Sequence, residues 1–208
     1  MGHEHPRHEE AVGSALPSGG DGPDADLARV LREAAGGSQQ AWGVLVGMYG
    51  RRIFALAKSR CRKREVAEDI TQSVLATVAT KLSSGEYVEQ GRFEAWLFRV
   101  VMNRVRDHVR SVRRRPEMAA GEAVEGVAAS GHAATGGSEL DALRSAMDRL
   151  ADADREVIEL RHHGGMSFKE MAEMLGEPLG TLLARHHRAL RKLREMMEAA
   201  EVRGEVTT

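Results

Sequence analysis

The sequence contains few cysteines and few aromatic residues. It has one cysteine, Cys61, in 208 residues, and aromatic residues make up only 4%. A single cysteine excludes an internal disulfide framework and is typical of a reducing compartment. Scarce aromatic residues favour small helical units packed with Leu, Val, Ala and Met over a β-sandwich.

Long apolar runs are also missing. No run approaches the ~20 residues that span a bilayer, so we expect no membrane insertion. The N-terminal residues MGHEHPRHEE lack the apolar core of a secretory signal. These features predict a cytoplasmic protein.

Signals of catalysis are absent as well. The acidic residues are scattered, and there is neither a glycine-rich phosphate loop nor a metal-spaced Cys/His set. His3, His5 and His8 could hold a metal loosely, but an aperiodic tail gives them no fixed geometry. We therefore expect no enzyme activity, no metal and no cofactor.

The net charge is only -1, but the charges are segregated. Acidic residues dominate before Leu27, and basic residues gather at positions 92–115 and 185–194. Two basic segments on a neutral chain indicate a polyanionic partner. Two solvated helix faces are the alternative interpretation.

Apolar residues recur at helical spacing along most of the chain, and no alternating β pattern persists. We predict an all-α protein with two small helical domains joined by a flexible linker. Residues 116–138 contain no Lys or Arg and few large apolar groups, which is typical of a linker. The predicted parts are a disordered acidic tail (1–25), a first domain (26–115), the linker (116–138), a second domain (139–198) and a tail (199–208).

Residues 167–194 have the pattern of a helix-turn-helix. Ala172 is small where a second helix must cross, and Gly176 can adopt the positive φ that ends the first helix. Pro178 suits the first turn of the second helix. This motif places its second helix in the major groove of DNA, although an ordinary corner between two helices is the alternative. The expected buried positions of the second helix are Leu182, Ala189, Leu190 and Leu193, with Thr181, Arg185 and Arg188 on the face away from them.

Three stretches together resemble the extracytoplasmic-function (ECF) sigma factors of bacterial RNA polymerase. They are AEDITQSVL (67–75), FEAWLFRVVMNRVRDHVR (93–110) and the segment from Asp154 to Arg194. Their order, their spacing and the intervening linker also match, so the resemblance covers roughly residues 26–197. It implies a promoter-specificity subunit whose partners are core RNA polymerase and promoter DNA. It further implies an anti-sigma factor as a third partner, because many family members are held inactive by one.

The resemblance also implies roles for individual residues. Glu68, Asp69 and Gln72 would bind the clamp of the polymerase. Promoter DNA near the minus-ten element would contact Trp96, Arg99, Asn103 and Arg106, although Trp96 could instead belong to the core. The minus-thirty-five element would contact Thr181, Arg185 and Arg188. The sequence departs from the family pattern at Ser73, Ala151, Leu183, Ala184 and His186.

Two other functions are consistent with parts of this sequence. A stand-alone helix-turn-helix regulator would need dimer symmetry, and no dimerisation helix is evident. An enzyme acting on nucleic acid would need clustered carboxylates or a positioned nucleophile. Cys61 lies among basic residues that would lower its pKa if it were exposed, as in a redox sensor; an ordinary helix residue is the simpler interpretation.

Overall fold

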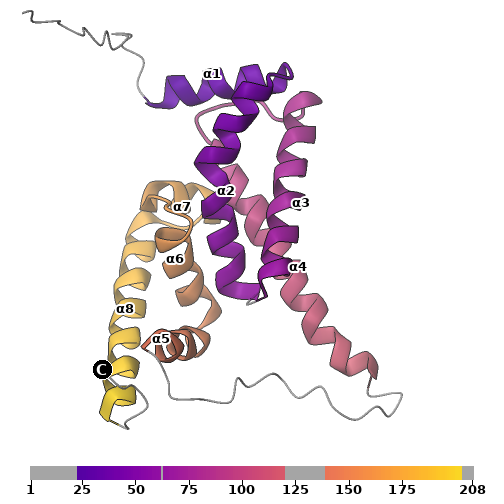
Figure 1. Cartoon of the computed structure of the whole chain (residues 1–208). Coiled ribbons are helices and arrows are strands. Elements are labelled where there is room, and N and C mark those ends of the chain that lie inside the picture. The colour runs from indigo at the N-terminus through magenta and orange to yellow at the C-terminus, as the bar shows by residue number, and fades with distance from the viewer. Residues whose placement is uncertain (1–22, 62, 120–138, 203–208) are drawn as a thin grey trace, which may run out of the picture.

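The computed structural model describes residues 23–61, 63–119 and 139–202, and within these ranges its only regular elements are helices. The all-α prediction is therefore confirmed. The described helices are α1 (Pro23–Ala35), α2 (Gln39–Cys61), α3 (Arg64–Ser83), α4 (Phe93–Ala119), α5 (Glu139–Asp148), α6 (Asp152–His162), α7 (Phe168–Leu175) and α8 (Leu179–Val202) (Figure 1). Most of the predicted linker, the three tail histidines and the last six residues lie outside the described ranges.

The first four helices form one bundle. Figure 1 shows α2, α3 and α4 side by side, with α1 across one end. On α3, the apolar residues Ile70, Val74 and Val78 recur at four-residue steps, and all three are buried. Their spacing places them on one face of the helix, which leaves the opposite face of α3 free for a partner.

Helix α4 begins at Phe93 and contributes Phe98, Val101 and Met102 to the core. It continues to Ala119, so its end includes the first residues of the predicted linker. Val112 continues the apolar stripe of Val101 and Val105 at helical spacing, yet it is 51% exposed. The reason is that the end of α4 projects beyond the bundle (Figure 1), where no neighbouring helix covers the stripe.

The C-terminal helices contain the predicted helix-turn-helix, made of α7 and α8. Ser167 begins α7 with a capping box, in which its Oγ accepts from Glu170 N at 3.2 Å and Glu170 Oε2 accepts from Ser167 N at 2.6 Å. Gly176 ends α7 with a φ of 69°, a conformation that costs other residues about 1–2 kcal/mol. Pro178 directly precedes α8 instead of lying in its first turn, and its carbonyl accepts from the backbone N–H of Thr181.

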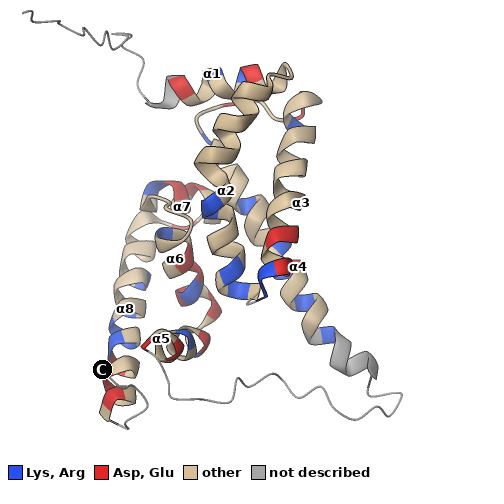
Figure 2. Cartoon of the chain, in the orientation of Figure 1, with Lys and Arg blue, Asp and Glu red and all other residues tan. Residues whose placement is uncertain are grey.

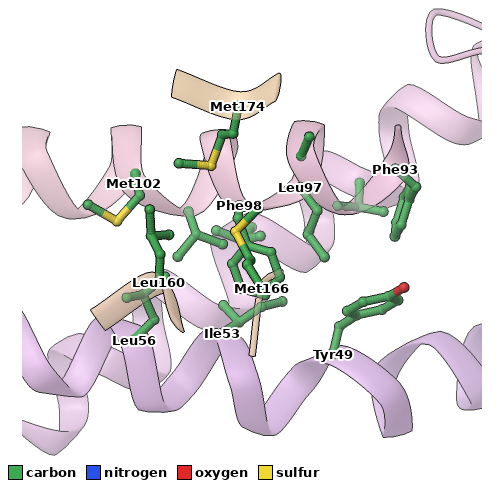
Figure 3. Packing of buried hydrophobic residues seen from close by; sticks show 14 of the residues in the cluster. Tyr49, Ile53, Leu56, Phe93, Leu97, Phe98, Met102, Leu160, Met166 and Met174 are labelled. Carbon is green, nitrogen blue, oxygen red and sulfur yellow. The ribbon is translucent and has the colours of Figure 1, made fainter. Parts of the chain in front are cut away.

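The two halves of the protein share one hydrophobic core. Leu160, Met166 and Met174 from the C-terminal half are buried in the same cluster as residues of α2 and α4. Figure 3 shows these side chains packed around Ile53, Leu56 and Phe98. A separate, smaller cluster joins α5, α6 and α8; its buried members are Ala146, Leu150, Ile158, Ala189 and Leu193.

Arginine side chains reinforce this packing between the halves. Arg52 Nε of α2 donates to Gly164 O at 2.7 Å, while its two Nη atoms bind Glu94 at 2.9 and 2.6 Å. Glu159 of α6 is completely buried between Arg60 of α2 and Arg155 of its own helix. Arg155 also donates to Ser59 O at 2.8 Å. The contact between the halves is thus built from specific polar bonds as well as apolar surface.

Candidate functional site

The predicted polymerase-binding residues lie on the outer face of α3. Asp69 and Gln72 are exposed and lie off the buried stripe of Ile70 and Val74. Glu68 is partly covered, and its Oε1 accepts from Arg64 Nε at 2.7 Å. The carboxylate of Asp69 and the amide of Gln72 therefore lie close together on the exposed face of α3. This negatively charged surface suits a basic partner.

The predicted minus-ten residues lie along one side of α4. At 100° per residue, Trp96, Arg99, Asn103 and Arg106 fall within about 80° of the helix surface. Asn103 is exposed, and Arg106 Nη1 lies 3.5 Å from its Oδ1. These residues therefore form one continuous side of α4, adjacent to its buried side.

Trp96 belongs partly to the core, and its contact with DNA stays a prediction. It is half-buried, with its ring centroid 4.5 Å from that of Tyr87 and 5.8 Å from that of Phe93. The partly exposed ring is held by an aromatic cluster, so its orientation is fixed by packing. A fixed aromatic surface is well suited to stacking with an unpaired base.

Two of the α4 arginines already have partners in the C-terminal half. Arg99 Nη2 donates to Met174 O at 2.7 Å and to Glu173 O at 3.3 Å, at the end of α7. Arg106 forms an ion pair with Glu156 of α6. Sequence reasoning missed these contacts, because helical periodicity carries no information about residues 50 or more positions apart.

On α8, Thr181 and Arg188 are exposed, as predicted. Arg185 differs: its side chain is 18% exposed and is held by Glu177, with Nη–Oε distances of 2.9 and 2.7 Å. This hydrogen-bonded carboxylate raises the pKa of Arg185. Arg185 follows the buried Leu182 by three residues and precedes the buried Ala189 by four, so it borders the buried face instead of opposing it.

Leu190 was expected on the buried face of α8, but it is 42% exposed. It lies on the same side of the helix as Leu179 and Leu183, which are 47% and 45% exposed. The prediction for Leu190 was wrong because Leu190 directly follows Ala189, which is fully buried, and adjacent residues of a helix point in different directions. Figure 2 shows that α8 carries basic residues along much of its length.

A pair of histidines joins α6 to α8. His162 Nε2 and His186 Nε2 are 3.2 Å apart, and the rings of Phe168 and His186 form a T-shaped contact with centroids 5.2 Å apart. Burial, followed by nearby positive charge, lowers the pKa of both imidazoles. The neutral pair can form one hydrogen bond if the two rings adopt opposite tautomers.

This pair predicts a pH-dependent stability. Because the folded-state pKa of each histidine lies below its unfolded value of ~6.5, unfolding takes up protons and stability falls as the pH drops below about 6.5. His186→Leu is expected to reduce that loss, whereas His187→Leu, at an exposed neighbour with no such contact, is expected to keep it. Thermal unfolding followed by circular dichroism between pH 7.5 and 5.5 measures the difference. Parallel pH profiles for wild type and His186→Leu would contradict the assignment.

Cys61 does not meet the condition for a low pKa. Its thiol is half-buried, and burial raises the pKa, which reduces the reactive thiolate. Among the described residues, no group of three or more His, Cys, Asp or Glu side chains is arranged to hold a metal ion. Nor is any described helix both long and apolar enough to cross a membrane.

Two family models match the chain in the order of its two halves. "Sigma-70 region 2" matches residues 45–115, which include α3 and most of α4. "Sigma-70, region 4" matches residues 146–195, which include the helix-turn-helix. The three surfaces described above therefore all lie within matched segments.

Curated proteins and solved structures agree with these models. The ECF RNA polymerase sigma factor BldN of Streptomyces coelicolor is 30% identical over 84% of this chain and 68% of its own length. The RNA polymerase sigma factor NccH of Alcaligenes xylosoxydans xylosoxydans is 30% identical over 86% of this chain and 98% of its own.

Among solved structures, CnrH in complex with the cytosolic domain of CnrY superposes with a TM-score of 0.62 at 28% identity, covering 83% of this chain and 97% of CnrH. The sigma factor RpoE of Bartonella quintana, in complex with the anti-sigma factor NepR, gives 0.58 at 27% identity, covering 75% and 96%. With both sigma-70 regions matched in order, and with sigma factors 30% identical along most of the chain, this protein belongs to the ECF sigma factors, the promoter-specificity subunits of bacterial RNA polymerase.

Proposed function

We propose that three separate surfaces of the chain bind the three partners of a sigma factor: core polymerase, the minus-ten element and the minus-thirty-five element. The Asp69–Gln72 surface of α3, with Glu68 beside it, binds core polymerase. The Trp96–Arg106 side of α4 opens and reads the minus-ten element, and α8 reads the minus-thirty-five element. The observation that carries this proposal is that all three surfaces lie off the buried faces of helices within the matched segments.

The chemistry of the α4 surface fits an opened strand. Asn103 can make paired hydrogen bonds to an exposed base edge, and Trp96 can stack on a base that has lost its neighbour. Arg99 and Arg106 supply charge for phosphates. The four residues extend over roughly 15 Å of helix, which is enough for a few nucleotides. If the protein were a stand-alone helix-turn-helix regulator, the Trp96–Arg106 side of α4 would have no function.

Regulation by an anti-sigma factor is also part of the proposal. RpoE of Bartonella quintana was solved with its anti-sigma factor NepR. In this chain, Leu179, Leu183 and Leu190 form an exposed apolar stripe on the side of α8 away from Arg188. Such a stripe suits a protein partner better than it suits DNA. We infer that the protein acts in the cytoplasm as a binding subunit, without catalysis of its own.

The α8 surface is tested by removing one charge. Arg188→Ala is expected to lower promoter affinity of the holoenzyme by about 1–3 kcal/mol and to relax preference at one base pair if Arg188 binds a base. If it binds only phosphate, affinity falls evenly for all sequences and the salt slope falls by about 1. Fluorescence anisotropy across a salt series distinguishes the two.

Arg194→Ala is the matched control, because it removes the same charge from an exposed position about 120° around α8 from Arg188. It is expected to change affinity much less. If Arg188→Ala and Arg185→Ala both leave the affinity and the salt dependence unchanged, α8 does not read DNA through this face.

A further inference from the structure

An ion pair crosses the turn of the helix-turn-helix. Glu177 lies between α7 and α8, directly after Gly176, and Arg185 lies in the second turn of α8. Arg185 Nη1 donates to Glu177 Oε1 at 2.9 Å, and Arg185 Nη2 lies 2.7 Å from Glu177 Oε2. Two parallel bonds of this kind fix the plane of a guanidinium as well as its position. Glu177 therefore decides where the donors of Arg185 point.

The ion pair leaves one edge of the guanidinium free. Arginine has five N–H donors, and the two bonds to Glu177 use one donor of each Nη. Arg185 Nε forms no hydrogen bond with a described residue, and no buried side-chain nitrogen in the described ranges lacks a partner. Arg185 Nε therefore reaches solvent. Its N–H and the remaining N–H of the neighbouring Nη form a two-donor edge, which matches O6 and N7 of guanine.

The position of Glu177 places this free edge near the start of α8. The side chain of Arg185 leans toward the N-terminus of its helix, as helical side chains do. Glu177 holds it from the turn that precedes the helix. Thr181 is exposed on the same side of α8, one turn before Arg185. Because the N-terminal residues of the second helix of such a motif contact base edges in the major groove, the free edge of Arg185 lies where bases are read.

The negative charge of Glu177 makes Arg185 a poor ligand for phosphate. The hydrogen bond to Glu177 raises the pKa of Arg185, and two carboxylates of α6, those of Asp154 and Glu156, add to this effect. Carboxylates repel a phosphate, whereas a base edge carries no net charge. Arg188 differs, because it is exposed and forms no ion pair with a described residue. These two neighbouring arginines of α8 therefore suit different parts of DNA.

We propose that Glu177 is a positioning residue, which holds Arg185 for a guanine of the minus-thirty-five element and keeps it away from phosphates. This inference rests on the proposed function of α8. It assigns part of the base preference to a residue of the turn that itself need not touch DNA. The side chains of the ion pair are 18% and 33% exposed, and such partly exposed pairs contribute little to stability. A change in base preference is therefore separable from a change in folding.

Glu177→Gln tests this inference, because it keeps the shape of the side chain and removes its charge and one acceptor oxygen. Holoenzyme reconstituted with core polymerase is titrated with three kinds of duplex, and binding is followed by fluorescence anisotropy. The duplexes are a promoter fragment that the wild-type holoenzyme selects from genomic DNA, its single-base-pair variants across the minus-thirty-five element, and a scrambled duplex of the same length. For Glu177→Gln, the preference for guanine at one position is expected to fall about tenfold.

Binding to the scrambled duplex is expected to change in the opposite direction. Without the carboxylate, Arg185 is free to bind a phosphate, so the affinity rises about threefold and the salt slope steepens by about 1. A purely structural role of Glu177 would instead change the affinities for the promoter fragment and the scrambled duplex together.

Two controls separate the position of the guanidinium from its charge. Glu198→Gln removes the same charge from an exposed position roughly 20 Å further along α8 and is expected to change neither preference nor affinity. Arg185→Lys keeps the positive charge but loses the planar fork, so it is expected to lose the same preference. Adding Glu177→Gln to Arg185→Lys is expected to cause no further loss, because no guanidinium is left to position. Circular dichroism reports whether each variant is folded.

Two results would overturn the inference while leaving the proposed function intact. One is an unchanged base preference in Glu177→Gln, and the other is an equal loss of affinity for the promoter fragment and the scrambled duplex. Either result would mean that the ion pair is only a structural contact of the turn. If the wild-type holoenzyme itself shows no base preference at any position of the minus-thirty-five element, the proposed function of α8 fails, and the inference fails with it.

Discussion

Replacing Asp69 by arginine together with Gln72 by alanine is expected to abolish core-dependent transcription. The double change replaces the carboxylate of Asp69 by a positive charge and removes the amide of Gln72, and like charges brought together at an interface cost several kcal/mol. Both residues are exposed and off the buried stripe of α3, so the fold should be unaffected. Run-off transcription measures the activity, and pull-down of core enzyme measures the binding. Circular dichroism measures whether the variant is folded.

The control reverses a charge elsewhere on the surface. Glu198→Arg, at an exposed position of α8, is expected to retain core binding. Normal core binding by the folded Asp69→Arg, Gln72→Ala variant would show that the polymerase uses another surface of the chain.

The largest loss of stability is expected at Glu159. Its carboxylate is completely buried between Arg60 and Arg155, whose side chains are only 14% and 13% exposed. Glu159→Ala leaves both guanidinium groups without their main partner, and breaking a buried pair in this way costs about 3–5 kcal/mol. Urea unfolding at pH 7 measures the change in unfolding free energy.

Glu33→Ala provides the comparison for Glu159→Ala. Glu33 is bound by Arg29 at 3.1 Å in an exposed pair on α1, and such pairs contribute about 0.5 kcal/mol or less. If Glu159→Ala lowers the free energy of unfolding by less than about 1 kcal/mol, water replaces the lost carboxylate. The ion pairs of Glu159 with Arg60 and Arg155 would then contribute little to the packing of α2 against α6.

Local patterns in the sequence were sufficient to predict most of the helices and the positions of their exposed faces. The four-residue steps of Ile70, Val74 and Val78 fix which side of α3 is buried, and hence that Asp69 and Gln72 face outward. Gly176 and its spacing from Leu182 identify the turn, because a positive φ at that place strongly favours glycine. These features depend only on neighbours within a few residues.

Contacts between distant residues could not be predicted in this way. Arg106 pairs with Glu156 and Arg60 with Glu159, and a charged residue on a helix face has the same sequence pattern whether it meets water, DNA or a carboxylate. The same limit applies to Arg185, whose partner Glu177 lies eight residues away across the turn. The sequence therefore located the basic surfaces but gave no sign that the two halves pack together.

Run-off transcription with and without core enzyme tests the central claim most directly. Holoenzyme reconstituted with this chain, on promoter fragments that the holoenzyme itself selects from genomic DNA, is expected to start transcripts at defined sites. The free chain is expected to bind the same fragments only weakly in a gel-shift assay. Tight, sequence-specific binding by the free chain, with no transcript when a cognate core enzyme is added, would contradict the assignment as a sigma factor and favour a stand-alone regulator.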